Sequence, residues 1–454
     1  MKRIKVVELY KNYEKYYDKD IVLSGWIIRK RNAKGGSLVF LDFTDGTYAS
    51  EVRCIVEGED LIKLTDNIND GYSVKIDGTV VESPANCTQE FEINVNSIEI
   101  YGKTDSYPIH KSNIGNMVSL RTIPHFRSRT LINASIFRMR SGLIDAMREF
   151  FKNRHIYQVD PNVLTASDCE GAGEMFTVTP NIFNKSKVGL TVSSQLQLEA
   201  IACSMGDVYT MNKSFRAEKS FTNKHVSEFM HVEAELTFIN LNDLINFTED
   251  FVKHCIKYMI VNFSKEYDMF DNSRRLVSCK NRRDMLVKYL NSEFRVITYD
   301  DAIRVIQDDL KAKKVKMKIR PKYGDDLGSE HEKYLVEKYD TFVFVTHWPL
   351  NIKSFYMKYG GNGTCESFDL LAPDVGELFG GSMREDNYDL LVSEMKKRNM
   401  NTSVLDWYIE LRQNGTVPHG GWGCGFDRML MFLTGLESIK DVIPFPVHPD
   451  NCKY

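Results

Sequence analysis

Short runs of apolar and β-branched residues, separated by turn residues, fill the first 102 residues of the chain. The runs are DIVLSGWII, SLVFLDFT, SEVRCIV, YSVKIDGTVV and FEINVNSIEIY. Runs of this length, bounded by Gly, Asp and Asn, predict strands, and five of them at close spacing predict a small β-barrel. The OB-fold is the barrel of this size that commonly binds single-stranded nucleic acid, so we expect an OB-fold over residues 1–102.

The pattern changes after this barrel. Residues 103–128 are polar with scattered proline, which is typical of a hinge linker. Residues 129–454 are expected to form a second domain that is large enough for a substantial core. Within it, the stretch from about 240 to 345 is charged and mostly helical, and we interpret it as an insertion with connecting helices.

The segment from Ser214 to Leu236 has the pattern of a β-hairpin with one polar face. Its second arm alternates an apolar set with a mainly polar one: Met230, Val232, Ala234 and Leu236 against Phe229, His231, Glu233 and Glu235. Period-2 geometry sends the two sets to opposite faces. Carboxylates in a row beside Arg216 and Glu218 predict a cleft for cationic or polyphosphate ligands. The alternative from this segment alone is an ordinary half-buried strand with a solvated face.

A glycine-rich segment, GGWGCGFDRMLMFLTG, lies near the C-terminus. Gly421, Gly423 and Gly425 leave one face of an extended segment without side chains, which lets a flat ligand or another backbone approach. Arg428 then lies over whatever occupies that space. A glycine trio alone is more typical of packing, but its combination with the hairpin favours a ligand site.

Charge limits how the chain meets nucleic acid. The formal net charge of −3 argues against bulk electrostatic capture, so any RNA must meet a local patch. Arg29, Lys30 and Arg31 lie near Phe40 in a Gly-rich hairpin and form such a patch. A solvent-facing Phe40 would offer a stacking platform for a base; the alternative is that it fills the barrel.

Cysteine usage and the N-terminus indicate the compartment. The nine cysteines form no CxxC pair and have no metal-ligand spacing, and MKRIKVVELY is charged without an apolar signal core. No segment approaches the roughly eighteen apolar residues that a membrane helix requires. We therefore expect a cytoplasmic protein with free thiols and no membrane contact.

Further segments accompany the hairpin and the glycine-rich end. Those segments are TASDCEGAGEMF, VSSQLQLEA, YGDDLGSEHEKYL, THWPLNIKSFYMK, FDLLAPDVGELFGGSMRE and GTVPHGG. Over essentially its whole length the chain resembles the class II aminoacyl-tRNA synthetases of the aspartate and asparagine group, most closely the asparagine-specific members of eukaryote-like type. The resemblance implies an α+β fold: an antiparallel sheet flanked by helices in a catalytic domain over residues 129–454, preceded by an all-β OB-fold anticodon-binding domain.

The reaction that the resemblance implies is activation of L-asparagine by ATP to an adenylate, followed by transfer to tRNA(Asn). The substrate's own carboxylate is the nucleophile, so the absence of a catalytic triad or a GxSxG elbow agrees with it. The protein must align two anions and cancel their charge, a task for Arg and Mg²⁺.

The resemblance assigns roles around ATP. Arg216 would bridge the substrate carboxylate and the α-phosphate, and Arg428 would lie over the adenine and near the γ-phosphate, both as catalytic groups. Glu218 and Phe229 would contact the adenine, Phe229 by stacking on the face opposite Arg428.

Two carboxylates and two loop residues complete the predicted ATP site. Asp369 and Glu377 match the ligands of Mg²⁺, and Glu377 also faces ATP; Asp369 taken alone is equally consistent with a turn or capping residue. In the hairpin loop His225 fits the family, whereas Lys224 stands where most relatives carry Arg. Lys keeps the charge and loses the fork, so we expect weaker binding of the γ-phosphate.

For the amino acid, Glu170, Ser193 and Gln195 match groups around the α-amino end, and Arg384 matches the residue that reaches the side-chain oxygen. Leu198 stands where aspartyl enzymes carry a Lys that pairs with the substrate carboxylate. Losing that cation makes an anionic side chain costly and an amide acceptable.

A second position also bears on specificity. Glu233 stands where aspartyl relatives usually have a shorter Asp, so its carboxylate is placed to accept the amide NH₂ and to repel aspartate.

At the anticodon, related enzymes stack a base on the Phe that matches Phe40, with Arg29 and Arg31 as neighbouring cations. Glu51 stands where family members usually have Gln. An ionised carboxylate cannot donate a hydrogen bond, so base recognition at this position is expected to differ.

An apolar stripe at helical spacing follows the linker: Ile136, Met139, Leu143, Met147 and Phe150. Such a stripe is more often core than interface. In class II synthetases the matching helix, with the strand that ends at the residue matching Pro161, forms the dimer interface, so the resemblance predicts a homodimer.

Three alternatives stay open. An aspartyl-tRNA synthetase, including one that charges both tRNAs, would activate aspartate. An asparagine synthetase of the same catalytic fold lacks the N-terminal barrel, so the first 102 residues argue against it. A protein that has lost catalysis and only binds RNA or a partner predicts decay of the ATP groups, which are all present.

Overall fold

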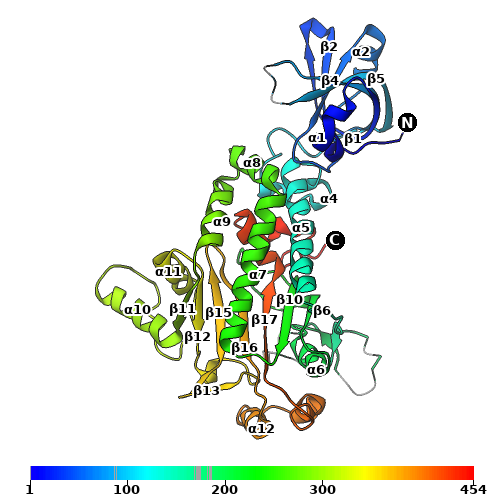
Figure 1. The fold of residues 1–454 in the computed structure, drawn as a ribbon. Helices are drawn as coiled ribbons and strands as arrows, with labels where there is room; N and C mark the ends of the chain where they lie inside the picture. Colours follow the sequence, from blue (N-terminus) through cyan, green and yellow to red (C-terminus); the bar gives the residue numbers. More distant parts are fainter. Residues whose placement is uncertain are drawn as a thin grey trace. The chain divides into compact units, whose positions relative to one another are not determined.

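The structure, a computed structural model, describes residues 2–85, 87, 89–167, 169, 175–180, 182–183 and 187–454. Its internal contacts divide the chain into two compact units (Figure 1). The first unit contains Met1–Met139 and Asp268–Val277, and the second contains Arg140–Tyr267 and Ser278–Tyr454. The stretch predicted as a linker, residues 103–128, thus groups with the barrel by its contacts.

A closed five-stranded barrel forms the core of the first unit. Its strands follow the five predicted runs: β1 (Asp20–Ala33), β2 (Leu38–Thr44), β3 (Val52–Glu57), β4 (Ser73–Glu82) and β5 (Phe91–Gly102). They close in the order β1-β2-β3-β5-β4, with β3 parallel to β5 and the other pairs antiparallel. The predicted OB-fold is confirmed.

Helices complete this unit. They are α1 (Val6–Asn12), η1 (Tyr13–Tyr16), η2 (Lys34–Gly36), α2 (Glu59–Thr65), α3 (Met117–Leu120), α4 (Pro124–Arg127) and the start of α5 (Leu131–Asn153). Val6 and Leu9 of α1 are fully buried in the same apolar cluster as Phe43 and Ile93 of the barrel. The N-terminal helix therefore caps the barrel core rather than extending away from it.

An eight-stranded sheet organises the second unit, in the order β11-β12-β15-β16-β17-β10-β9-β6 (Figure 1). The strands are β11 (Arg295–Thr298), β12 (Val343–Thr346), β15 (Ser367–Ala372), β16 (Gly376–Met383), β17 (His419–Gly425), β10 (Glu228–Thr237), β9 (Val208–Phe215) and β6 (Tyr157–Gln158). The six central strands pair antiparallel, as predicted. The two edge pairs, β11 with β12 and β6 with β9, are parallel, so the sheet as a whole is mixed.

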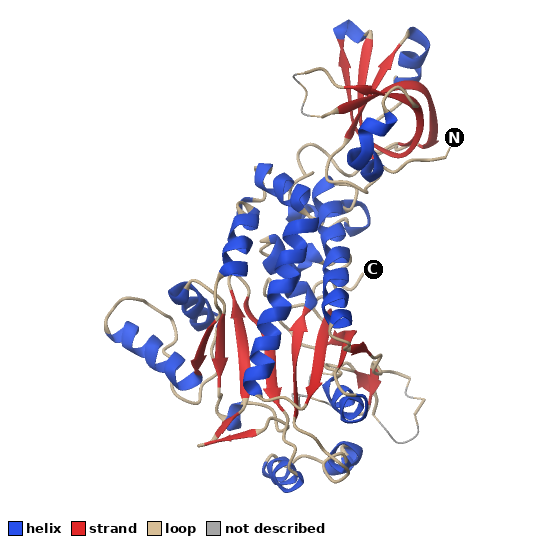
Figure 2. Cartoon of the chain, in the orientation of Figure 1, coloured by secondary structure: helices blue, strands red, loops and turns tan. Residues whose placement is uncertain are grey.

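Two small sheets lie outside this sheet, and the remaining helices of the chain, drawn in Figure 2, include α8, which contributes Asp268–Asn272 to the first unit. The small sheets pair β7 (Leu164–Thr165) with β8 (Gly189–Leu190), and β13 (Tyr359–Gly361) with β14 (Thr364–Cys365). The helices are α6 (Gln195–Met205), α7 (Leu241–Asn262), α8 (Ser264–Asn272), η3 (Val277–Cys279), α9 (Arg282–Asn291), α10 (Tyr299–Lys311), α11 (Ser329–Tyr339), η4 (Leu350–Ile352), α12 (Tyr388–Lys397), η5 (Thr402–Val404), α13 (Asp406–Glu410), α14 (Phe426–Thr434) and α15 (Ile439–Val442).

The stretch from about 240 to 345 is part of the domain's architecture. It supplies α7, which packs on β16 and β17, and also the strands β11 and β12. These two strands are only four residues each, which is too short for a clear period-2 signal, so the sequence pattern shows mainly the helices around them.

One face of the sheet is covered by aromatic side chains from α5 and α7. Trp422 of β17 lies 5.0 Å from Phe251 and 6.3 Å from Phe151, measured between ring centroids. All five residues of the predicted helical stripe on α5 are also fully buried within the chain. Because these groups cover this face, the opposite face of β10 and β17 is the one left to build a site.

Candidate active site

The open face of the sheet carries rows of polar residues and glycines that cross four strands. The register aligns Asp369 of β15 with Gly380, Gly423 and then Glu233 of β10. The next row on this face contains Ser367, Ser382, Gly421 and Glu235. Neighbouring strands lie about 4.8 Å apart, so the backbones of Asp369 and Glu233, three strand spacings apart, are separated by about 14 Å. The two glycines between them form a floor without side chains.

The glycines of β17 make room for the side chains of β10. A Cβ at Gly421 would lie 2.3 Å from Oε2 of Glu235, and a Cβ at Gly423 would lie 2.6 Å from Nε2 of His231. Contacts this short would displace both polar groups. The alternate glycines noted in the sequence therefore admit functional side chains of the neighbouring strand and also keep the floor low.

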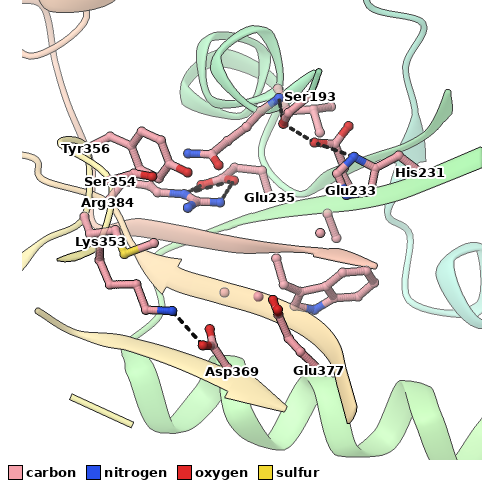
Figure 3. Close-up of a pocket in the computed structure, with 18 of the residues that line it drawn as sticks. Ser193, His231, Glu233, Glu235, Lys353, Ser354, Tyr356, Asp369, Glu377 and Arg384 are labelled. Carbon is pink, nitrogen blue, oxygen red and sulfur yellow. Dashed lines mark hydrogen bonds and ion pairs between the residues drawn. The ribbon is translucent and has the colours of Figure 1, made fainter. Parts of the chain in front are cut away.

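A cavity of about 420 Å³ stands over this floor (Figure 3). Residues of β10, β15, β16 and β17 line it, together with the start of α6 and the segment around η4. Figure 3 shows Arg384 and Glu235 in one group of lining side chains, and Lys353 and Asp369 in another. The cavity thus has two chemically distinct ends.

Glu233 is held in place from the start of α6. Its carboxylate accepts hydrogen bonds from the hydroxyl of Ser193 and from the backbone N–H of Ser194, the latter at 3.0 Å to Oε2. Nδ1 of His231 lies 3.6 Å from Oε1, and burial lowers the pKa of this histidine, which favours the neutral ring. A carboxylate has about four acceptor positions, so Glu233 can still accept N–H groups of a ligand.

Arg384 is paired with Glu235 at the same end. Nε donates to Oε1 at 3.0 Å, Nη2 donates to Oε2 at 2.9 Å, and Nη1 donates to Oγ of Ser382 at 2.8 Å. Burial raises the pKa of Glu235, and the guanidinium opposes that rise. These contacts use three of the five N–H groups of Arg384, so among the described residues two N–H groups are left for an acceptor in the cavity.

The alternative of an ordinary strand with a solvated face is wrong, because Glu233 is 3% exposed and Glu235 is fully buried. The reason is that Ser193, Ser194 and Arg384 satisfy them.

Asp369 and Glu377 share the other end. A Cβ at Gly380 would lie 3.3 Å from Oε1 of Glu377 and 3.9 Å from Oδ1 of Asp369, so both carboxylates flank this glycine. Nζ of Lys353 donates to Oδ2 of Asp369 at 2.6 Å. Burial raises the pKa of Asp369 to about 7; Lys353 opposes the rise and Glu377 adds to it.

A second cavity, of about 200 Å³, joins the first. Arg216 lines both cavities, and so do Glu377 and Gly423. The second cavity is further lined by predicted ATP-site residues: Glu218, Lys224, His225, Phe229 and Arg428. The structure therefore brings the two arginines, 212 positions apart in the sequence by their numbers, to one cavity.

Contacts within this second cavity fix its arginines. The guanidinium carbon of Arg216 lies 5.6 Å from the ring centroid of Phe229, and Nη1 of Arg428 donates to the carbonyl of Glu377 at 2.6 Å. Glu218 lies 4.0 Å from Arg216. Arg216 is thus held beside the second cavity by Phe229 of β10, and Arg428 by Glu377 of β16.

Charges crowd the outer part of this cavity. Burial, with Arg428 nearby, lowers the pKa values of Lys224 and His225; Glu332 opposes the shift at Lys224. Burial and Glu377 raise the pKa of Glu332 to about 6. Cations that repel one another in a partly buried space favour binding of a polyanion.

Leu198 and Gln195 line the first cavity from α6. Leu198 is 1% exposed and packs in an apolar cluster with Ala202 and Val208, so no cation replaces the missing lysine at this position. Glu170, predicted to contact the amino group, lies outside the described residues.

On the barrel, Phe40 is half-buried while Val39 and Leu41 are fully inside. The guanidinium carbons of Arg31 and Arg53 each lie 5.7 Å from the centroid of the Phe40 ring. The ring therefore faces away from the barrel core with cations beside it, which is the geometry of a stacking platform.

The remaining predicted anticodon residues, Arg29 and Glu51, have contacts of their own within the barrel unit. Asp42 pairs with Arg29 at 3.3 Å and with Arg31 at 2.9 Å. The backbone carbonyl of Glu51 accepts hydrogen bonds from the Tyr10 hydroxyl and from Nε2 of Gln89, both at 2.7 Å.

Sequence reasoning left several residues of these sites without a role. Glu235 follows Glu233 in the same alternation, Lys353 lies in the THWPLNIKSFYMK segment, and Glu332 lies in YGDDLGSEHEKYL. Arg53 lies on β3 opposite Asp42, so strand pairing would have suggested it. The signals were present, but the partners are distant in the sequence.

Residues 121–449 match the family described as tRNA synthetases class II (D, K and N), and residues 21–101 match the OB-fold nucleic acid binding domain. The chain belongs to this class II tRNA synthetase family.

Relatives of the chain are named as enzymes that act on asparagine. The chain is 38% identical to asparagine–tRNA ligase of Bacillus anthracis and 36% identical to that of Clostridium tetani, each over 100% of both chains. Among solved structures, asparaginyl-tRNA synthetase from Pyrococcus horikoshii complexed with asparaginyl-adenylate superposes with a TM-score of 0.87 at 28% identity, covering 100% and 99% of the two chains. The Entamoeba histolytica enzyme in complex with asparaginyl-adenylate gives 0.84 at 26% identity, covering 96% and 97%.

No helix in the described part of the chain is long and apolar enough to cross a membrane.

Proposed function

We propose that this chain activates L-asparagine with ATP and transfers it to the 3′ end of tRNA(Asn). The observation that carries the proposal is the position of Arg216, which lines both the glycine-floored cavity and the cavity that contains Arg428. The names of the full-length relatives, and the asparaginyl-adenylate bound by two structural neighbours, support the same assignment.

The activation step joins the carboxylate of the amino acid to the α-phosphorus, with pyrophosphate as the leaving group. Both reactants are anions, so a cation placed between them lowers the barrier. Arg216 supplies a planar fork for both oxygens, while Arg428, Lys224 and His225 lie where the phosphates would extend. Phe229 offers a flat ring for the adenine, beside Glu218.

Selection of the side-chain amide follows from the end of the first cavity that contains Arg384 and Glu233. Arg384 offers N–H groups to the side-chain oxygen, and Glu233 offers acceptor positions to the NH₂. Aspartate would place a third carboxylate near Glu233 and Glu235, with Leu198 in place of a cation. Burying such an unpaired charge costs several kcal/mol, an order of magnitude sufficient for discrimination.

We assign Asp369 and Glu377 as the residues that would hold Mg²⁺. Two carboxylates flank one glycine, and burial with the nearby Glu377 raises the pKa of one of them, Asp369, so a divalent cation fits between them. Among the described residues no cluster of three or more such ligands occurs, and Mg²⁺ usually takes one or two carboxylates with phosphate oxygens and water. The bound ion would neutralise part of the negative charge on the phosphates of ATP.

The remaining assignments concern the cellular compartment and the oligomeric state. The nine cysteines are all free thiols, in accord with a cytoplasmic protein.

A homodimer needs apolar surface, and the α5 stripe is already buried within the chain. Such surface is offered by two exposed residues, Tyr157 of the edge strand β6 and Leu164 of β7. A sedimentation mass of one chain would contradict the dimer.

The test of the proposal is ATP–pyrophosphate exchange with each of the twenty amino acids. We expect exchange with asparagine and at least about a hundredfold less with aspartate, as the unpaired charge would cost several kcal/mol. Equal rates with aspartate would favour an aspartyl enzyme. No exchange with any amino acid would favour a protein that only binds RNA.

Phe40→Ala is expected to raise the KM for tRNA about 5- to 150-fold, because a stacked base contributes about 1–3 kcal/mol. Exchange without tRNA is expected to remain unchanged, since the ring belongs to the barrel. Tyr101→Ala, which removes another exposed aromatic of the barrel, is the matched control. Equal effects of the two variants on charging would remove the special role of Phe40.

A further inference from the structure

Glu199 of α6 is fully buried at the centre of a polar network beside the amino-acid cavity. Its Oε2 accepts hydrogen bonds from the Tyr408 hydroxyl at 2.7 Å, from Nη2 of Arg412 at 2.7 Å and from Nε2 of His419 at 3.2 Å. Its Oε1 accepts from Nε2 of Gln195 at 3.0 Å. Three donors from residues 408–419 thus hold one oxygen, while Gln195 donates to the other, which also lies 3.8 Å from Nε of Arg384.

The network keeps this carboxylate ionised. Burial favours the neutral form, but Arg412 and His419 outweigh it and lower the pKa of Glu199. Nδ1 of His419 lies 2.7 Å from the carbonyl oxygen of Val417 while Nε2 faces the carboxylate. Both ring nitrogens face acceptors, so the ring carries both protons and is a cation.

An ionised carboxylate can only accept hydrogen bonds. The amide nitrogen of Gln195 must therefore face Glu199, and the amide cannot turn over without placing two acceptors against each other. Gln195 also lines the amino-acid cavity. With its nitrogen engaged inside the protein, its carbonyl oxygen is the atom left for the cavity, where it suits a donor such as an ammonium group.

We propose that Glu199 is a positioning residue for asparagine, because it fixes the Gln195 carboxamide with the carbonyl oxygen toward the substrate ammonium. The inference rests on the proposed function, in which Gln195 contacts the amino end of the amino acid. Glu199 itself does not line the cavity and need not touch the substrate.

Glu199→Gln tests this inference in the full-length enzyme by asparagine-dependent exchange. A glutamine at this position can donate as well as accept, so the Gln195 amide would turn freely. We expect the KM for asparagine to rise about tenfold or more, with kcat changed less than about threefold, because the ammonium contact is the same in the ground and transition states. The KM for ATP is expected to stay constant.

Two further variants separate orientation from general support of the fold. Tyr408→Phe removes one donor to Oε2 and leaves Gln195 bound, so the KM for asparagine is expected to change less than about twofold. Exchanging the two side chains, Gln195→Glu with Glu199→Gln, places a carboxylate at 195 that presents an oxygen whichever way it turns. This double variant is expected to restore the KM for asparagine to within about threefold of the unaltered enzyme.

A KM for asparagine that stays within twofold in Glu199→Gln, or one that stays high in the exchanged double variant, would overturn the inference. If Glu199→Gln alone does not fold, the double variant decides by the same threefold limit. Absence of asparagine exchange in the unaltered protein would instead refute the proposed function.

Discussion

Arg216→Ala is expected to lower kcat/KM for asparagine-dependent pyrophosphate exchange at least about a thousandfold. Arg216 lines both cavities, so its charge lies where two anions must approach. Removing a single donor that is preorganised for a transition state costs about 3–4 kcal/mol, and a guanidinium supplies both donors and charge. The measurement is exchange at saturating and limiting concentrations of each substrate, which separates kcat from KM.

Arg216→Lys is the matched control. The charge is kept, but the fork and the planar contact with the Phe229 ring at 5.6 Å are lost. We expect an intermediate loss of about ten- to a hundredfold. The folded state of both variants should be unchanged by circular dichroism, since the side chain is about a third exposed. An alanine variant within tenfold of the unaltered enzyme would show that the carboxylate and the phosphate meet elsewhere.

The alternation in the second arm of the hairpin predicted which side chains share a face, because the strand period is fixed by covalent geometry. It did not predict their burial. Glu233 is covered by the start of α6 and Glu235 by Arg384, and neither neighbour can be inferred from the strand itself. A carboxylate on a strand looks solvated until its partner is known.

The glycines of β17 show a similar limit. Their spacing indicated an empty face, but only the register shows that Gly421 lies opposite Glu235 and Gly423 opposite Glu233. Register depends on contacts between strands almost two hundred residues apart in the chain, which no local pattern contains.

Edge strands were the least visible part of the fold. β6 contains only Tyr157 and Gln158, and β11 contains four residues. Segments this short have no measurable periodicity, and their parallel pairing is set by the elements that precede them. The family resemblance, by contrast, covers the whole chain, so it supplied expectations for the domain order and the site residues that periodicity could not supply for the edge strands.

Arg384→Gln has the second large expected effect. It removes the side chain that donates twice to Glu235 and lies 3.8 Å from Glu199, so two buried carboxylates lose their shared cation. Breaking a buried ion pair by removing one partner costs about 3–5 kcal/mol of folding stability. The same change removes the N–H groups offered to the side-chain oxygen, so we expect loss of asparagine activation by at least about a thousandfold.

The double variant Arg384→Gln with Glu235→Gln separates the effect on folding stability from the effect on asparagine recognition. When both partners become neutral, no charge is buried unpaired, and the free energy of unfolding in denaturant should recover most of its loss. Asparagine exchange should not recover, because a glutamine at 384 lacks the paired N–H groups of a guanidinium. Glu235→Gln alone is the control that keeps Arg384 and should destabilise less. Recovery of exchange together with stability would show that Arg384 supports the fold without reading the amide, and the basis of asparagine selection would then have to lie with Glu233 and Leu198.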